Sequence, residues 1–333
     1  MSVDGRAVVT GGGGFLGGAI VRALLDDNIQ VTSVSRGNYP ELEALGVACH
    51  QADLADPGAP LADWFEGADT VYHCAAKAGV WGDLAAFRRA NVEATQQVIA
   101  ACLAAGVARL VFTSSPSVCF DGRDQRMASN DLPYAADFLS PYPQTKAEAE
   151  RLALASHGRT GAGGPLSVCA LRPHLIYGPG DPHLIPRVLE KARAGKLRIV
   201  GRGDNEVSLT HVQNAAAAHL AAAARLSPDA ACGGQAYFIA DPSPVQLWTW
   251  IDQLLGQHGL PKVTRRIPRA LATAAGTLLE SIWRIQKRPG EPPMTRFVAA
   301  QLSTDHSYDL GPAQRDLGYN PRPPRDLPGD YPS

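Results

Sequence analysis

The 333-residue chain has no excess of either charge and no long uncharged hydrophobic run. Its 31 Lys and Arg nearly balance its 32 Asp and Glu, which gives a formal net charge of −1. Binding to nucleic acid normally requires a basic surface, so this balance argues against a nucleic-acid partner. A membrane-spanning helix needs about 20 apolar residues, and a signal peptide needs a basic start followed by an apolar run. Neither pattern is present, and we expect a cytoplasmic protein.

The cysteines also lack a functional pattern. The six cysteines form no CxxC pair, and most lie in apolar runs such as TVYHCAA and LSVCAL. We therefore expect small buried thiols in a reducing compartment. The nine histidines are scattered, and no metal site is expected.

Strand-like and helix-like segments alternate over the first half of the chain, which predicts parallel βαβ units with helices on both faces of one sheet. After Arg172, Pro and Gly become frequent and the strands become short. We expect an α/β fold with a doubly wound Rossmann sheet and a smaller C-terminal lobe over its carboxyl edge. The expected boundaries are 1–173 for the dinucleotide-binding domain, with 200–228 returning to it, 174–199 and 229–320 for the substrate-binding lobe, and 321–333 for a Pro-rich tail.

One helix of this lobe is predicted over residues 268–285, in PRALATAAGTLLESIWRI. Its apolar side chains could pack in the core of the lobe, line a substrate pocket or face a membrane surface. We favour core packing.

A glycine-rich turn predicts a dinucleotide site. Gly11, Gly14 and Gly17 form a GxxGxxG motif directly after the strand VVT, and Phe15 and Leu16 begin the next helix. The first glycine permits the tight turn, the second lets the backbone approach a pyrophosphate, and the third lets helix and strand pack closely. The free N–H groups of the helix would then face the phosphates.

The end of the second strand indicates which cofactor is preferred. A site for NAD usually has Asp or Glu there to bind the ribose 2′-hydroxyl, but this chain has Ser35 followed by Arg36. A guanidinium suits a 2′-phosphate, and we expect NADP(H) in preference to NAD(H). Asp53 and Leu54, after the third strand, are expected at the adenine.

Tyr142 and Lys146 form a YxxxK pair that predicts acid–base chemistry. Their i, i+4 spacing places both on one face of a helix. A tyrosine has a free pKa of about 10, and we expect the nearby ammonium to lower it. Thr113, Ser114 and Ser115 end a strand near the expected nicotinamide position. Ser115 is the predicted third catalytic group, with Ser114 as the alternative.

These motifs together resemble the extended short-chain dehydrogenases/reductases. The resemblance covers the chain from its start to about residue 220. The matching segments are TGGGGFLG (10–17), DL (53–54), HCAA (73–76), ANVEAT (90–95), FTSSPSVCF (112–120), YPQTK (142–146) and LRPHLIYGPGD (171–181). The resemblance implies that Ala75 and Ala76 line the cofactor, that Asn91 supports the site from its helix, and that Pro173 begins a loop along the nicotinamide. Ala94 stands where family members usually have Gly.

Within that family, the segments KAGVWG (77–82), RPHLIYGPGDPHLIPR (172–187) and GEPPMTRF (290–297) resemble the 3β-hydroxysteroid dehydrogenase type. They are most similar to the group of bacterial reductases that act on 2-alkyl-3-oxoalkanoates in long-chain olefin synthesis. This resemblance implies NADPH-dependent reduction of an apolar β-keto acid to the β-hydroxy acid. It also implies a homodimer formed through helices 84–105 and 142–157, and partner enzymes in a lipid pathway.

Three alternatives remain open: a 3β-hydroxysteroid or sterol dehydrogenase that can decarboxylate its substrate, a nucleotide-sugar epimerase, and an NADP-sensing protein without catalysis. The apolar residues of the lobe favour an apolar substrate, and the presence of both Tyr142 and Lys146 disfavours the sensor. If the substrate carries a carboxylate, His174, His183, Arg187 and Arg202 are candidate cations for it.

Overall fold

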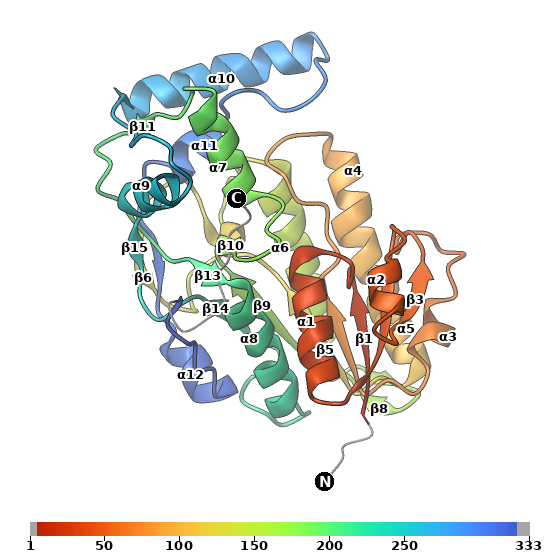
Figure 1. Ribbon diagram of the computed structural model, residues 1–333. Helices are drawn as coiled ribbons and strands as arrows, with labels where there is room; N and C mark the ends of the chain where they lie inside the picture. Colours follow the sequence, from red (N-terminus) through yellow and green to blue (C-terminus); the bar gives the residue numbers. More distant parts are fainter. Residues whose placement is uncertain (1–4, 325–333) are drawn as a thin grey trace.

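The computed structural model describes residues 5–324, and its centre is a seven-stranded sheet in which all neighbouring strands are parallel (Figure 1). In spatial order the strands are β14 (Ala236–Ile239), β9 (Ser167–Pro173), β5 (Arg109–Thr113), β4 (Thr70–His73), β1 (Arg6–Thr10), β2 (Gln30–Ser35) and β3 (Ala48–Gln51). The order reverses between β1 and β4. Doubly wound sheets bind ligands beyond the carboxyl ends of the strands at this position.

Helices cover both faces of the sheet, as the alternating pattern predicts. One face carries α1 (Phe15–Asp26), α8 (Val212–Arg225) and α12 (Gly311–Leu317), and the other carries α3 (Leu61–Phe65), α5 (Ala94–Ala105) and α6 (Pro141–Leu154). Adjacent residues of a strand point to opposite faces, so Val9 joins the α1–α8 core while Val8 joins the α3–α5 core. This two-sided burial fixes the carboxyl ends of the strands relative to one another.

The single helix expected at 84–105 is divided into three segments. The chain forms α4 (Leu84–Arg88), one turn of π-helix, η1 (Arg89–Glu93), and then α5, which ends at Gly106 in the left-handed conformation. Single π-turns inside α-helices are frequent at functional sites. Here the π-turn contains Asn91.

The second lobe forms around a four-stranded sheet and two short pairs of strands. The four strands are β15 (Val245–Gln246), β12 (Glu206–Val207), β17 (His306–Tyr308) and β6 (Gln125–Ala128), and the pairs are β10 (Ile176–Tyr177) with β13 (Thr210–His211) and β11 (Ile199–Val200) with β16 (Arg266–Ile267). A further short hairpin, β7 (Thr160–Gly161) with β8 (Gly164–Pro165), lies against α5 of the main domain. The remaining helices are α2 (Pro40–Glu43), the 3₁₀ turn η2 (Pro116–Cys119), α7 (Leu184–Arg193), α9 (Leu247–Gln257), α10 (Arg269–Ile285) and α11 (Arg296–Gln301).

Two segments lie on the other side of the boundary expected from the sequence. β14 is the edge strand of the main sheet although it follows residue 229, and β6 joins the sheet of the lobe although it precedes residue 173. Both strands are short, and their placement depends on pairing with strands that are distant in sequence. The Pro-rich tail is described only to residue 324, and residues 325–333 lie outside the described part of the chain.

The core packing expected for the helix at 268–285 is wrong for three of its large side chains. Leu271, Leu278 and Ile285 of α10 are 59%, 62% and 82% exposed. The core of the lobe is formed instead by residues such as Trp248, Leu254 and Leu255. In Figure 1, α10 lies along the outer edge of the lobe, far from the amino ends of the main strands.

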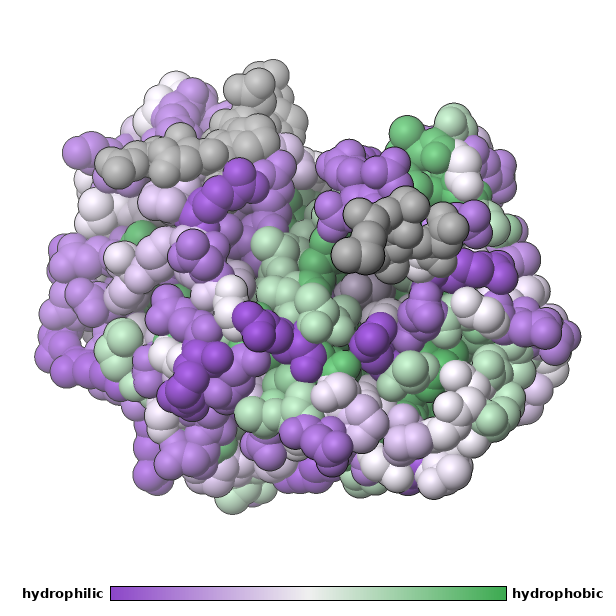
Figure 2. Space-filling view, turned by 90° about the horizontal axis from the view of Figure 1, so that it is seen from below, coloured by the Kyte–Doolittle hydropathy of each residue, from purple (hydrophilic) through white to green (hydrophobic). Residues whose placement is uncertain are grey.

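Seen from below Figure 1, at the side where the main strands begin, the surface is mostly hydrophilic with small scattered apolar areas (Figure 2). Within residues 5–324, no helix combines the length and the hydropathy that crossing a bilayer requires.

Candidate active site

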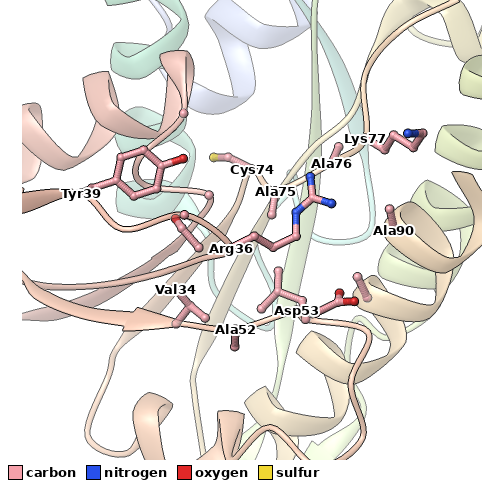
Figure 3. Close-up of a pocket in the computed structure, with 16 residues that line it drawn as sticks. Val34, Arg36, Tyr39, Ala52, Asp53, Cys74, Ala75, Ala76, Lys77 and Ala90 are labelled. Atoms are coloured by element: carbon pink, nitrogen blue, oxygen red, sulfur yellow. The ribbon is translucent and has the colours of Figure 1, made fainter. Parts of the chain in front are cut away.

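A cavity of about 540 Å³ opens at the reversal of strand order (Figure 3). Its wall comes from the segments that follow β1, β2, β3 and β4 and from η1 and α5. The lining residues are Gly11, Gly14, Val34, Ser35, Arg36, Gly37, Tyr39, Ala52, Asp53, Leu54, Cys74, Ala75, Ala76, Lys77, Ala90 and Ala94. Eight of them are residues that the sequence assigned to a dinucleotide, namely Gly11, Gly14, Ser35, Arg36, Asp53, Leu54, Ala75 and Ala76.

The glycine turn leaves room for a ligand at the start of α1. Gly11 has a φ of +73°, and a Cβ on it would lie 2.9 Å from the Cα of Ala75. A Cβ on Gly17 would collide with the carbonyl of Gly11. Gly14 occupies the N-cap of α1 and has no side chain that could cap the first N–H groups. These groups and the helix dipole suit a pyrophosphate, so the cavity fits a dinucleotide.

Phe15 and Leu16 can contact a bound phosphate only through their backbone N–H groups. The Leu16 side chain is buried in the core beneath α1, and Phe15 packs against the same core. Neither side chain lines the cavity. Their N–H groups lie in the first turn of α1, where a bound phosphate would meet them.

Arg36 and Asp53 differ in their electrostatic roles. The Arg36 guanidinium extends across the cavity toward Ala75 and Ala76 (Figure 3), and within residues 5–324 it forms no ion pair. Asp53 is already paired with Arg89 at 2.8 Å, and the hydrogen bond from that guanidinium holds the pKa of Asp53 below its usual value. The Ser35 hydroxyl accepts the Gly13 N–H at 3.3 Å. Arg36 is therefore the cation available to a ligand in this part of the cavity.

Sequence reasoning missed Tyr39. Its ring lies where a Cβ on Gly13 would have to be, and it forms one wall of the cavity opposite Arg36 (Figure 3). Tyr39 follows the second strand in the irregular segment GNYP, which matches no dinucleotide-binding motif that could have drawn attention to it.

Tyr142 and Lys146 lie on the first two turns of α6, on one face, as their spacing predicts. The Lys146 ammonium donates to the carbonyl oxygen of Thr113 at 2.6 Å and lies 4.1 Å above the Phe112 ring. Its burial lowers the pKa of Lys146 to about 8, although the charge of Glu150 acts in the opposite direction. Lys146 is thus fixed to the end of β5.

Ser115 lies beside Tyr142. Burial raises the pKa of Tyr142, and the hydrogen bond with the Ser115 side chain acts in the opposite direction. The Ser115 hydroxyl also lies 2.9 Å from that of Ser117. The Ser114 side chain is buried and lies beside Glu150, whereas the Ser115 side chain bonds Tyr142. Ser115 is therefore better placed than Ser114 to act together with Tyr142.

The expected lowering of the Tyr142 pKa is not found. The Lys146 ammonium is bound to the Thr113 carbonyl, and desolvation of the phenol dominates. Tyr142 is consequently a neutral phenol at pH 7, which is the form that can donate a proton.

Asn91, Thr113 and Pro173 support the site without lining the cavity. Asn91 accepts the Lys77 N–H at 2.7 Å and donates to the Thr145 hydroxyl at 3.0 Å, so it joins the cavity wall to α6. The Thr113 hydroxyl lies 2.8 Å from His219 and bonds the Cys74 sulfur. Pro173 is buried at the end of β9.

A buried ion pair anchors α6 to the main sheet. Arg172 of β9 donates to both carboxylate oxygens of Glu150, at 2.9 and 2.5 Å, and Tyr134 donates to the same carboxylate at 2.7 Å. Side-chain exposure is 4% for Arg172 and 0% for Glu150. Burial alone would raise the pKa of Glu150, but the hydrogen bonds and charge of Arg172 outweigh it and leave that pKa below its usual value.

Two of the four candidate cations for a substrate carboxylate are already paired. Arg187 pairs with Glu291 at 2.8 Å, and Arg202 pairs with Asp204 at 3.2 Å. His174 is buried, which lowers its pKa well below its usual value and keeps it neutral. His183 is exposed at the start of α7.

This fold and this site define an NAD(P)-dependent oxidoreductase of the extended short-chain dehydrogenase/reductase type. The family model of the 3-beta hydroxysteroid dehydrogenase/isomerase family matches residues 8–269, and the chain belongs to that family.

Individual relatives agree with this assignment. A 2-alkyl-3-oxoalkanoate reductase of Stenotrophomonas maltophilia is 45% identical over 95% of both chains. One of Shewanella oneidensis is 46% identical over 95% of this chain and 82% of its own length. A human sterol-4-alpha-carboxylate 3-dehydrogenase, decarboxylating, is 34% identical over 95% of this chain and 84% of its own.

Among solved structures, MoeE5 in complex with UDP-glucuronic acid and NAD is 30% identical with a TM-score of 0.72. The match covers 96% of this chain and 94% of MoeE5. The similarity extends over both lobes.

Replacing Arg172 with Met should destabilise the protein by about 3–5 kcal/mol, because Glu150 would remain buried without its partner. Urea unfolding followed by circular dichroism measures this loss. Glu148→Gln is the matched control: Glu148 lies two residues earlier on α6 and pairs with Arg88 at the surface, so its loss should cost less than about 1 kcal/mol. Equal losses for the two variants would contradict the anchoring role.

Proposed function

We propose that the protein reduces 2-alkyl-3-oxoalkanoates, which are β-keto acids with long apolar arms, to 2-alkyl-3-hydroxyalkanoates with NADPH. The observation that carries this proposal is the grouping of Ser115, a neutral Tyr142 and Lys146, which Thr113 joins to the wall of a cavity that fits a dinucleotide. The 45% and 46% identical reductases support the choice of substrate.

The cofactor would be held by the glycine turn at its pyrophosphate, by Arg36 at a ribose 2′-phosphate, and by the residues after β3 at its adenine. When bound, NADPH supplies the hydride. The absence of a carboxylate at the end of β2 and the unpaired Arg36 guanidinium support NADP(H) over NAD(H).

Each catalytic residue has a distinct task in the reduction. The Tyr142 phenol donates its proton to the ketone oxygen as the β-carbon gains hydride, so the product is an alcohol and Tyr142 is left as tyrosinate. The Ser115 hydroxyl donates a hydrogen bond to the same oxygen and orients it. As the tyrosinate forms, the Lys146 ammonium on the next turn of α6 would stabilise its negative charge, whereas in the resting site desolvation of the phenol outweighs that attraction and keeps Tyr142 neutral.

Buried hydrogen bonds hold these three groups in place. Lys146 is fixed by the Thr113 carbonyl, and α6 is fixed by Asn91 and by the Glu150–Arg172 pair. A site whose side chains are fixed in this way needs little reorganisation during the reaction.

We further propose that the protein acts in the cytoplasm as a homodimer formed through α5 and α6, together with other enzymes of a lipid pathway. These two helices lie next to each other on one face of the main sheet. Two copies could align them into a four-helix interface.

Tyr142→Phe should lower turnover of a 2-alkyl-3-oxo acid by about 10²–10⁴-fold, because the proton donor is lost. NADPH binding, followed by fluorescence titration, should be nearly unchanged. Tyr237→Phe is the control: it removes a phenol hydroxyl that donates to Asp316 outside the cavity and keeps the ring, and turnover should stay within about twofold. Near-normal turnover of Tyr142→Phe would remove Tyr142 from the mechanism.

The pH profile of reduction should show a falling limb near pH 8. Burial lowers the pKa of Lys146 to about 8, so its ammonium is present below that pH and is lost as pH rises. The neutral amine cannot stabilise tyrosinate, and kcat/KM for reduction should fall above this value. A profile that stays flat to pH 10 would contradict this role for Lys146.

Arg36→Asp should shift the preference from NADPH toward NADH, because a carboxylate repels a 2′-phosphate and binds a 2′-hydroxyl. The ratio of kcat/KM for the two cofactors measures the shift. Arg123→Asp, which makes the same charge change at an exposed site outside the cavity, should leave the ratio unchanged. If the Arg36 variant behaves like this control, Arg36 does not select the cofactor.

A further inference from the structure

Helix α10 packs on the lobe through small residues and through its one acidic residue, Glu280. Ala272, Gly276 and Glu280 are buried at four-residue intervals. A Cβ on Gly276 would lie 2.7 Å from the carbonyl carbon of Thr295, so the helix lies directly against backbone. The Glu280 carboxylate accepts the Arg296 backbone N–H at 2.7 Å and its Nε–H at 2.9 Å. The fully buried residues of α10 are therefore small or acidic, and Leu279, Ile282 and Trp283 are only half-buried.

The outer face of α10 is apolar. Leu271, Leu278 and Ile285 recur every seven residues, which is about two helical turns, and so form one stripe. They are three of the five large hydrophobic side chains that are exposed within residues 5–324. An ordinary surface helix has polar residues on the face that α10 gives to this stripe. A gathered stripe of this kind marks an interaction site.

Positive charge surrounds this stripe. Residues 262–288 contain seven Lys or Arg and one Asp or Glu, whereas the whole chain has a net charge of −1. The cations lie before and after the apolar stretch of the helix; they are Lys262, Arg265, Arg266, Arg269, Arg284, Lys287 and Arg288. The acid is the buried Glu280, and in the described part of the chain none of the seven cations forms an ion pair. Arg266 and Arg269 donate to the backbone carbonyls of Arg202 and Gly122, but no carboxylate within residues 5–324 neutralises them, so the segment keeps an excess of positive charge that attracts an anionic partner.

We propose that α10 docks flat on an anionic phospholipid membrane. The stripe of Leu271, Leu278 and Ile285 would enter the boundary between headgroups and acyl chains, and the cations at both ends would bind lipid phosphates. An apolar face flanked by Lys and Arg on a helix too short to span the bilayer is typical of helices that lie in the interface.

The position of α10 relative to the cavity gives this docking a use. The Arg284 guanidinium lies 5.2 Å from the centre of the Trp81 ring. Trp81 belongs to the segment after β4, whose first residues, Cys74 to Lys77, form part of the cavity wall. Docking would bring the membrane near the site, where a substrate with long alkyl arms could pass from lipid to protein. The docking itself does not depend on the proposed reaction.

Co-sedimentation of the full chain with vesicles tests the docking. Vesicles that contain one phosphatidylglycerol for every three phosphatidylcholines should bind the protein, and pure phosphatidylcholine vesicles should bind it at least about tenfold less. Raising NaCl from 0.05 to 0.5 M should weaken the binding, because the headgroup contacts are screened. Equal binding to both vesicles, or no binding to the anionic ones at low salt, would overturn the proposal.

Matched variants locate the contact. Leu278→Asn should reduce the partition coefficient on anionic vesicles by about tenfold or more, because an apolar side chain no longer enters the bilayer. Leu45→Asn replaces another exposed leucine, outside α10, and should change nothing. Thermal unfolding and NADPH affinity should be unchanged in both. If Leu278→Asn instead converts a dimer into a monomer in light scattering without vesicles, a second copy covers the stripe and the membrane proposal is overturned.

Discussion

The ion pair between Glu150 and Arg172 is the contact on which the geometry of the site depends. Glu150 follows Lys146 by one helical turn and Tyr142 by two. Arg172 belongs to β9, which pairs with β5, and β5 leads directly to Ser115. The pair thus joins the helix that carries Tyr142 and Lys146 to the sheet that leads to Ser115. Because both charges are buried, a shift of α6 would expose an unpaired charge to an apolar interior, which is strongly unfavourable.

Two further contacts extend this arrangement to the cavity. Lys146 bonds the Thr113 carbonyl, and the Thr113 hydroxyl bonds Cys74 in the cavity wall. Asn91, in the π-turn, bonds both Lys77 and Thr145. The cavity wall and α6 are therefore joined by hydrogen bonds that are buried or partly buried. The π-turn thus contains the residue whose amide bonds both sides.

Much of this site follows from the sequence because its determinants are local. The glycines at 11, 14 and 17 act through backbone sterics of their own turn, and the spacing of Tyr142 and Lys146 places both on one helix face whatever surrounds them. Other features depend on residues far apart in the chain. The Asp53–Arg89 pair, the Tyr39 wall and the raised pKa of Tyr142 arise only when separate segments meet.

The orientation of α10 could not be predicted for the same reason. The spacing of its apolar residues is visible in the sequence. Which side of the helix faces the lobe depends on the contacts of Gly276 and Glu280 with the start of α11, which is distant in sequence. The boundary at residue 229 differs from the structure for a related reason, because β14 is placed by pairing with β9.

Transfer of deuterium tests the central claim, that this site reduces a β-keto acid, most directly. The protein would be incubated with a 2-alkyl-3-oxoalkanoate and NADPH deuterated at C4, in separate reactions for each of the two faces of the ring. Mass spectrometry should then find a 2-alkyl-3-hydroxyalkanoate that carries one deuterium at C3 from one face only. Unlabelled product from both forms, or no hydroxy acid despite NADPH binding, would contradict the account.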